Sequence, residues 1–403
     1  MATTSLRLPA DEYTGAPKET FLGEEWHERD LEAIFRPRWL IAGHVDELDG
    51  GGSGHGYITY SLGREEILIR RDEEGVVRGF HNFCPHRGAQ LCESGHGAMS
   101  SKRIVCPYHA WTFSASDGSL LSARHMHEDF DSQALPLKPV HVEEWKGLIF
   151  VCLGDEAPLP VAELFEEISF EGYEVERMKL ATVKSHDIEA NWKIVVENNL
   201  ECYHCTVIHP ELSAEMDWKL FATEDFEGHI AERAEGLELM HGDKTPWDFN
   251  RELSRLTRTT IGGKRVCAIP SPREDDVVDP PGAGMIWEPG LALSISRDHG
   301  WIFVPKPINS HRTELRQYWL VAPDAEEGRD YELDDLMRFW DVTMVQDRDV
   351  CQRVQRGMDM PAYEPGPLNR IYQTGQAGFY AWYMAQIEKH FPALAEQALA
   401  GGD

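Results

Sequence analysis

The chain has 403 residues, 42% of them hydrophobic, so it can bury a sizeable core and form two or three domains. Its formal charge of −30 argues against nucleic acid and anionic membranes as partners, because phosphate groups would be repelled. No apolar run reaches the ~18 residues that span a bilayer, and residues 1–15 are polar, so we expect a cytoplasmic protein with reduced cysteines.

The N-terminal part of the chain predicts a helix followed by β-structure. Apolar residues at helical spacing indicate a helix within residues 18–41 that ends at Pro37. From there to about Leu153, short β-rich runs alternate with glycine-containing turns, which is typical of a small all-β domain. Its clearest strands are expected at residues 57–60, 67–69 and 148–151.

Two short cysteine–histidine motifs lie inside this β-rich region. They are Cys84-Pro-His86-Arg-Gly and Cys106-Pro-Tyr-His109-Ala-Trp. Each motif would place one thiolate and one imidazole at a hairpin tip. Such a set can hold a tetrahedral zinc ion, or a [2Fe–2S] cluster with cysteines on one iron and histidines on the other. The prolines that shape the tips, and the small residues between them, favour the cluster.

A second candidate site lies in residues 197–210, where Glu201, His204 and His209 occur close together. Two imidazoles at this spacing describe half of a two-histidine, one-carboxylate iron site. On a regular helix the two histidines would diverge by about 140°, and Pro210 disfavours helical backbone at the residue before it. We therefore expect His204 on the last turn of a helix, sharing a face with Glu201, and His209 just past that turn.

The last third of the chain predicts strands and then a long helix. Strands are expected at residues 285–296, 300–305 and 313–321, after a proline-rich loop at 270–283.

The long helix is expected over residues 331–356, with Gly357 just after its last turn. Asp347 falls on its buried stripe, whose other members are Leu336, Trp340, Thr343, Cys351 and Val354. A buried carboxylate is costly unless it is paired or binds a metal, so Asp347 is the candidate third ligand. A buried ion pair with an arginine is the alternative.

Together the two motifs resemble the alpha components of Rieske non-heme iron oxygenases, and the resemblance extends from Phe35 to Met384. It implies that Cys84 and Cys106 bind one iron of a [2Fe–2S] cluster, and that His86 and His109 bind the other. It also implies that a facial triad binds Fe(II), formed by His204, His209 and Asp347. In this family an acid at the position of Glu201 bridges to a cluster histidine of the neighbouring subunit in a head-to-tail trimer.

The resemblance further implies an α+β fold in two domains. A small all-β Rieske domain is expected at residues 38–157, and a larger catalytic domain at 158–403, on which residues 1–37 would pack. The catalytic domain is expected to be of the helix-grip, START-like type, with an antiparallel sheet and long C-terminal helices.

The sequence Glu201-Cys-Tyr-His-Cys and the segments 340–348, 355–357 and 363–367 resemble the branch of the family that acts on quaternary ammonium compounds such as glycine betaine, carnitine, stachydrine and choline. This implies hydroxylation of an N-methyl group, with O₂ and with NAD(P)H-derived electrons passed on by a flavin and iron–sulfur reductase. Formaldehyde would be released. Residues 215–290, which should line the pocket, do not match, so oxidation of another betaine, an aromatic ring or an O-methyl ether is the alternative.

A third hypothesis is an electron carrier or a zinc-stabilised binding protein. It explains neither the buried Asp347 nor the long chain beyond the cluster domain. A quaternary ammonium group would be held by aromatic faces, for which the candidates are Trp287, Trp301, Phe303 and Tyr380. Each of these is more often a core residue, so none is assigned to the site. Cys202 and Cys205 are expected to be packing residues rather than ligands.

Overall fold

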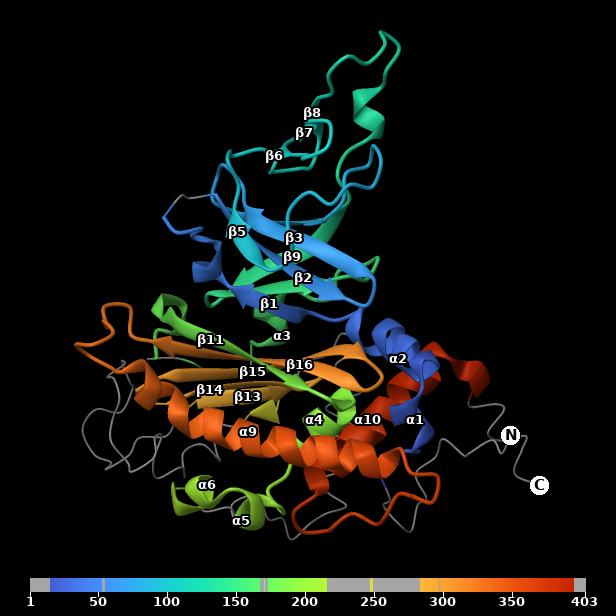
Figure 1. Ribbon diagram of the computed structural model, residues 1–403, viewed down its shortest axis with the longest axis vertical. Helices are drawn as coiled ribbons and strands as arrows, with labels where there is room; N and C mark the ends of the chain where they lie inside the picture. The colour runs from blue at the N-terminus through green and yellow to red at the C-terminus, as the bar shows by residue number, and fades with distance from the viewer. Residues whose placement is uncertain are drawn as a thin grey trace. The chain divides into compact units, whose positions relative to one another are not determined.

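The computed structural model describes residues 15–52, 55–166, 170, 173–215, 247–248, 283–296 and 298–394 (Figure 1). The chain divides into two compact units. The small unit is Phe35–Val161, and the large unit combines Met1–Ile34 with Ala162–Asp403. Over the described ranges, no helix has the length and apolar character that crossing a membrane requires.

The small unit is a β-structure. In its described part, one sheet of seven antiparallel strands has the order β1-β10-β9-β4-β3-β2-β5, and a second sheet has the order β6-β7-β8. The strands are β1 (Leu40–His44), β2 (Gly56–Leu62), β3 (Glu65–Arg71), β4 (Val77–His81), β5 (His96–Ala98), β6 (Ile104–Val105), β7 (Thr112–Phe113), β8 (Leu120–Ser122), β9 (Pro139–Trp145) and β10 (Leu148–Cys152), with 3-10 turns at Val45–Leu48 and Ser132–Ala134. The strands predicted at 57–60, 67–69 and 148–151 are confirmed as parts of β2, β3 and β10.

The large unit is built on an antiparallel sheet. Its described strands follow the order β11-β16-β15-β14-β13-β12. They are β11 (Lys179–Ile188), β12 (Trp247–Asp248), β13 (Ala283–Trp287), β14 (Leu291–Ile295), β15 (Gly300–Asn309) and β16 (Arg312–Val321). The strand predicted over 285–296 is a hairpin, because Glu288–Gly290 form a turn between β13 and β14. The other two predicted strands are confirmed in β15 and β16, and the predicted loop at 270–282 lies outside the described residues.

The chain also forms helices, of which α4 and α9 contact this sheet. They are α1 (Glu19–Leu22), α2 (Glu24–Asp30), a π turn (Leu31–Phe35), α3 (Val161–Leu164), a 3-10 turn (Val175–Arg177), α4 (Trp192–Asn199), α5 (Cys205–Ile208), α6 (Pro210–Glu215), α9 (Leu333–Met358) and α10 (Thr374–His390). The prediction of one continuous N-terminal helix is wrong, because Gly23 has extended backbone between α1 and α2. Gly357 also lies inside α9 rather than after it, and Val354 is 39% exposed rather than buried.

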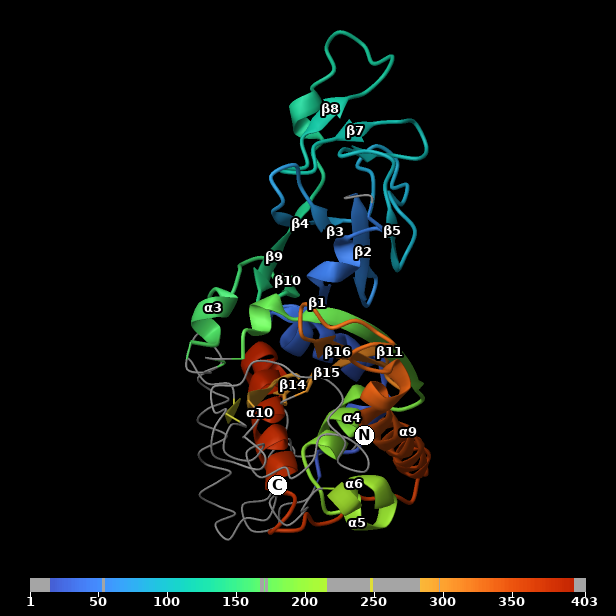
Figure 2. The ribbon, with the colours of Figure 1, turned by 90° about the vertical axis from the view of Figure 1, so that its left-hand side faces the viewer.

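Helix α4 lies between α9 and α10, against β15 and β16 (Figure 2). It is buried nearly all round, and its charged residue Lys193 is neutralised by Asp30 of α2. The same carboxylate accepts hydrogen bonds from Trp192 Nε1 at 2.8 Å and from Tyr383 Oη of α10 at 2.6 Å. A buried charge with this many partners is stable, so Asp30 holds three helices together.

Helix α9 is also bonded to the start of α4. The Asn191 side chain caps α4 by accepting the Lys193 backbone N–H at 3.0 Å. The Asn191 backbone N–H donates to Gln355 Oε1 at 2.8 Å, and the Glu189 N–H donates to Gln352 Oε1 at 3.2 Å. Two glutamines of α9 therefore fix the N-terminal end of the helix that leads to Glu201 and His204.

Candidate metal centres

The two cysteine–histidine motifs of the small unit form hairpin tips with the same backbone hydrogen bonds. At the first tip, the Cys84 N–H donates to Ala89 O and the Gly88 N–H donates to Cys84 O. At the second, the Cys106 N–H donates to Trp111 O and the Ala110 N–H donates to Cys106 O. The fourth residue after each cysteine has positive φ, +72° at Gly88 and +57° at Ala110. The two motifs therefore adopt one turn geometry, although their histidines stand two and three residues after the cysteine.

These tips bring the cysteines together inside the unit and the histidines together outside it. Cys84 and Cys106 are 1% and 2% exposed, belong to one core cluster, and interact through their side chains. The His86 and His109 rings are exposed, with centroids 4.8 Å apart, and His86 stacks on Trp111 at 4.4 Å. The structure thus groups all four predicted residues at one end of the small unit.

The chemistry of this set suits a [2Fe–2S] cluster. Burial and the neighbouring Cys106 thiol raise the pKa of Cys84 to about 11, although backbone N–H groups of His86 and Arg87 point at its sulfur and oppose that rise. Two buried thiols lose their protons readily only beside a cation. N–H groups directed at sulfur are typical of iron–sulfur sites, where they tune the reduction potential.

In the large unit, His204, His209 and Asp347 converge on one point. His209 Nε2 lies 2.9 Å from Asp347 Oδ1, His204 Nε2 lies 3.3 Å from the same oxygen, and the two Nε2 atoms are 3.1 Å apart. His209 and Asp347 are only 1% and 7% exposed. The structure therefore brings together three residues that the sequence separates by 143 positions.

The second ring nitrogen of each histidine is held by an acceptor. Glu201 Oε1 lies 2.6 Å from His204 Nδ1, and Gln346 Oε1 lies 2.8 Å from His209 Nδ1. Gln346 in turn donates from Nε2 to Glu211 Oε2 at 2.8 Å. An imidazole that donates its Nδ1 proton presents a lone pair at Nε2, which is the arrangement of metal-ligating histidines.

The three converging atoms fit a metal ion. Asp347 Oδ1 is buried and forms no hydrogen bond with the described residues, so it and the two lone pairs would repel one another without a cation. Ligand atoms about 2.1 Å from a metal on one face of an octahedron lie about 3.0 Å apart, as these do. A proton has a similar effect: burial lowers the pKa of His204, but the neighbouring Asp347 and Glu201 carboxylates outweigh it and raise the pKa to about 9.

The local backbone differs from the prediction. Helix α4 ends at Asn199, so Glu201 and His204 do not share a helix face. His204 instead directly precedes α5, and His209 directly follows it. The cause is the Glu201 carboxylate, whose Oε2 accepts the backbone N–H groups of Tyr203 and His204. This acceptor replaces helical hydrogen bonds and turns His204 back toward His209. The expectation that His209 lies just past a helix is confirmed.

Cys202 and Cys205 are joined by a disulfide, so the prediction of reduced cysteines is wrong at this pair, whereas their predicted packing role is confirmed. Both residues are buried and pack with Leu212 and Phe339. Cys205 also lies within 4.8 Å of the two histidines. Because its sulfur is bonded to Cys202, it offers no thiolate, and Asp347 is the better third ligand.

A cavity of about 250 Å³ adjoins this centre within the large unit. It is lined by Glu197, Asn198, Glu201 and His204, by side chains of α9 and α10, and by the loop between those helices. Of the aromatic candidates, Tyr380 lines this cavity, whereas Trp301 stacks on Trp340 with ring centroids 4.1 Å apart. All four candidates are at most 5% exposed, as core residues are.

Two residues near the centre of His204, His209 and Asp347 were not predicted from the sequence. Gln346 directly precedes Asp347, and Glu197 stands four residues before Glu201. An amide next to a buried ligand and an acid one turn before another acid were the available signals. Neither is specific, because glutamine and glutamate are common on exposed helix faces.

Two family models match the chain. Residues 175–389 match the model for the ring hydroxylating alpha subunit (catalytic domain), and residues 38–142 match the model for the Rieske [2Fe-2S] domain. These matches cover both centres described above.

Curated relatives and solved structures agree with the family models. The chain is 32% identical over 391 residues to the glycine betaine monooxygenase oxygenase subunit of Chromohalobacter salexigens, covering 91% of this chain and 85% of the relative. It is 38% identical over 203 residues to the carnitine monooxygenase oxygenase subunit of Acinetobacter pittii, covering 48% and 52%. A crystal structure of a quaternary ammonium Rieske monooxygenase with an inhibitor matches with a TM-score of 0.70 and 25% identity, covering 93% of this chain and 96% of that one.

Proposed function

Because the chain belongs to the ring-hydroxylating oxygenase alpha subunits that carry a Rieske [2Fe–2S] domain, we propose that it N-demethylates a quaternary ammonium compound such as glycine betaine. The predicted fold class and oxygenase family are confirmed: the chain is a Rieske non-heme iron monooxygenase with a [2Fe–2S] cluster and a mononuclear iron. The observation that carries the substrate proposal is the 32% identity to a glycine betaine monooxygenase subunit across 91% of this chain. Other betaines, such as carnitine, are the nearest alternatives.

We assign the ligands as the geometry favours. Cys84 and Cys106 would hold one iron of the cluster, and His86 and His109 the other. His204, His209 and Asp347 would hold the mononuclear iron, which supplies O₂ activation when bound. Glu201 and Gln346 orient the two imidazoles by accepting their Nδ1 protons.

The proposed reaction also requires a suitable substrate pocket in the large unit. Hydroxylation of an N-methyl carbon gives a carbinolamine, which collapses to formaldehyde and a tertiary amine. A quaternary ammonium group offers no hydrogen-bond donor, so an aromatic and apolar pocket is the environment that holds it. The burial of His209 and Asp347 supports this chemistry, because it shelters these two ligands from bulk water.

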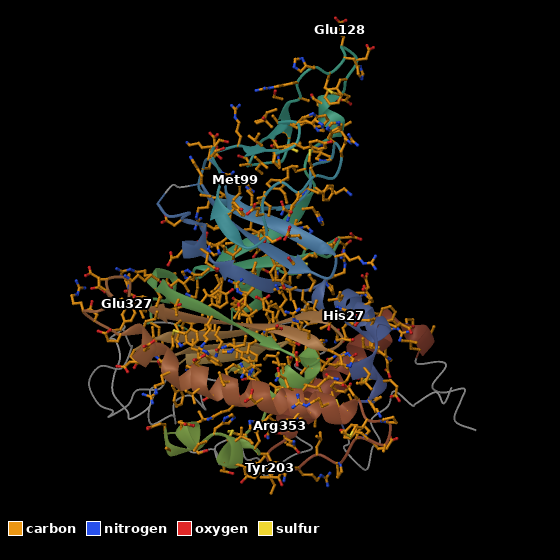
Figure 3. All side chains as sticks on the ribbon, viewed as in Figure 1. His27, Met99, Glu128, Tyr203, Glu327 and Arg353 are labelled. Carbon is orange, nitrogen blue, oxygen red and sulfur yellow. A yellow bond between two sulfur atoms is a disulfide. The ribbon has the colours of Figure 1, made fainter. Side chains whose placement is uncertain are left out.

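We further propose a head-to-tail homotrimer, in which the cluster of one subunit serves the iron of the next. Exposed apolar residues occur beside both centres. Val105 and Tyr108 are 41% and 58% exposed at the cluster tips. Around Glu201, Val207 is 81% exposed, and Tyr203, labelled in Figure 3, is 53% exposed and stacks on Tyr372. Two such surfaces would bury each other between subunits, with Glu201 bridging to a cluster histidine.

The trimer is tested by mixing two inactive chains. Asp347→Ala removes the iron site and Cys106→Ser removes the cluster, so neither chain should turn over alone. Co-expressed in one assembly, they should recover part of the activity, because an intact cluster would face an intact iron across an interface. Recovery that is absent from a co-purified mixed assembly would contradict transfer between subunits.

The substrate is tested with the purified oxygenase, a reductase of the flavin and iron–sulfur type, and NADH or NADPH. Formaldehyde should be released from glycine betaine at a rate matched to NAD(P)H consumption. Carnitine, stachydrine, choline and aromatic methyl ethers are run in parallel, and product from an aromatic substrate alone would overturn the proposal. Because NAD(P)H supplies the electrons, we also propose a cytoplasmic location.

A further inference from the structure

Ionisable side chains follow one line along α4 and past its end. Lys193, Glu197 and Glu201 are spaced four residues apart. Side chains at this spacing lie above one another on a helix, so Lys193 and Glu197 are neighbours on α4. Lys193 is bonded to Asp30 at one end of the line, and Glu201 is bonded to His204 at the other. Glu197 stands between them.

Glu197 lacks the partners that a buried carboxylate normally has. It is only 6% exposed, and its carboxylate forms no hydrogen bond and no ion pair within the described part of the chain. Burial and the nearby Glu201 carboxylate raise the pKa of Glu197 to about 8, while Lys193 opposes the rise. A carboxyl group in this setting is protonated at neutral pH.

The side chain lines the cavity that also reaches His204. With a volume of about 250 Å³, this cavity can hold several water molecules. A second polar group of its wall, Gln376 Oε1, is buried and forms no hydrogen bond with the described residues. Two buried polar groups without protein partners on one cavity are the setting in which ordered water is found. Val354, on the same wall, is 39% exposed to solvent.

Other ionisable groups face Glu197 from each packed element. Lys193 of α4 is paired with Asp30, and Glu201 is bonded to His204. Burial raises the pKa of the Cys351 thiol of α9, and burial and Glu197 raise the pKa of Tyr363 in the loop after α9. Tyr380 of α10 lines the cavity. None of them offers Glu197 a free positive charge. The burial of Glu197 and the lack of such a partner therefore favour the protonated form of its carboxyl group.

We propose that Glu197 holds a proton at the edge of the iron site and delivers it, through cavity water, to the oxygen atom that leaves as water. Monooxygenation joins one C–H bond, one O₂ molecule, two electrons and two protons to give one C–OH group and one H₂O. The O–O bond breaks, a C–O bond forms, and the electrons come from NAD(P)H through the reductase and the cluster. One of the two protons comes from Glu197, which solvent reprotonates through the cavity.

This inference rests on the proposed iron ligands but not on the substrate. Its first test therefore needs no turnover. The holoenzyme, Glu197→Gln and the control Glu189→Gln, an exposed acid just before α4, are melted at pH values from 5 to 9. A carboxyl group whose folded pKa is raised contributes stability below its unfolded pKa of about 4.5 and loses it as pH rises through about 8. The Tm of Glu197→Gln minus that of wild type should therefore grow over this range, and the control difference should stay flat.

The second test uses turnover. With unchanged iron content and cluster absorbance, Glu197→Gln should lower kcat at least about 10-fold with little change in KM, and increase the solvent isotope effect. The wild-type rate should fall above pH 8, and the variant should lose that limb. Glu197→Asp, which keeps an ionisable group, should restore part of kcat.

The outcomes separate the proposals. A flat Tm difference, or an unchanged kcat and pH limb in Glu197→Gln, would overturn the role of Glu197. If no quaternary ammonium compound is oxidised by wild type, the substrate proposal fails, while the melting experiment and turnover with whichever substrate is active still decide the role of Glu197.

Discussion

The two centres of this chain use histidine in opposite surroundings. In the small unit, the cysteines are buried and both histidines are exposed. In the large unit, His209 and Asp347 are buried, and both imidazoles are fixed from behind by Glu201 and Gln346. An exposed imidazole edge suits a centre that exchanges electrons with other molecules. A buried, hydrogen-bonded imidazole suits a centre that must keep open coordination positions away from bulk water.

The strongest way to separate the centres is to remove one of them. Asp347→Ala should lose the mononuclear iron and all coupled turnover, since two histidines alone hold Fe(II) weakly. The cluster in the other unit should be unaffected. Iron should fall from about three to about two per chain, with acid-labile sulfide and visible absorbance unchanged. Full iron content in this variant would mean that another acid is the ligand.

The connection between the centres is probed by Glu201→Gln. The amide oxygen can still accept from His204 Nδ1, so both metals should stay bound, although the amide nitrogen cannot accept the backbone N–H groups of Tyr203 and His204. It cannot carry the negative charge that would hold a cluster histidine across the proposed interface, so we expect coupled turnover to fall by about 100-fold or more. NAD(P)H oxidation coupled to product is measured beside metal content. Normal coupling would refute the bridging role.

The support behind His209 is probed by Gln346→Ala. Loss of an outer acceptor typically lowers metal affinity about 10- to 100-fold, so the mononuclear iron should leave faster under a chelator. Arg353→Ala, at an exposed position of the same helix, is the control. Equal rates of iron loss in both variants would count against the orienting role.

The smallest expected effect is a change in stability when two glycines, one in each unit, are replaced by alanine. Gly88 has positive φ at a cluster tip, and a Cβ there would meet nothing within 4 Å, so Gly88→Ala should destabilise the small unit by about 1 kcal/mol through backbone strain alone. Gly357 also has open space around it but is helical, so Gly357→Ala should stabilise α9 by up to about 1 kcal/mol. Thermal melting of each variant measures both signs. A shift in the same direction for both would contradict the argument from φ.

The parts of the two sites that could be predicted from the sequence depend on short spacings and on helical period. The hairpin tips could be predicted because each depends on one short motif, Cys84-Pro-His86 or Cys106-Pro-Tyr-His109. Asp347 could be found because a buried stripe on a 26-residue helix leaves few explanations for a carboxylate. The ligand roles themselves stay predictions until metal content is measured.

Other features could not be predicted, because they depend on tertiary contacts. The end of α4 depends on Glu201 accepting two backbone N–H groups, a choice that competes with helix and leaves no pattern in the sequence. The role of Gln346 depends on which way the His209 ring turns. Glu197 looks like an ordinary helical acid until its burial and the cavity beside it are known.

The hydrogen bonds from Asn191 and Glu189 to Gln355 and Gln352 have a consequence for how iron enters the enzyme. They fasten the helix that carries Asp347 to the beginning of the segment that carries both histidines, at positions outside the coordination sphere. We expect these bonds to hold the two elements together while iron is absent. Iron lost to oxidation or to a competing chelator should then be reloaded without refolding of the chain.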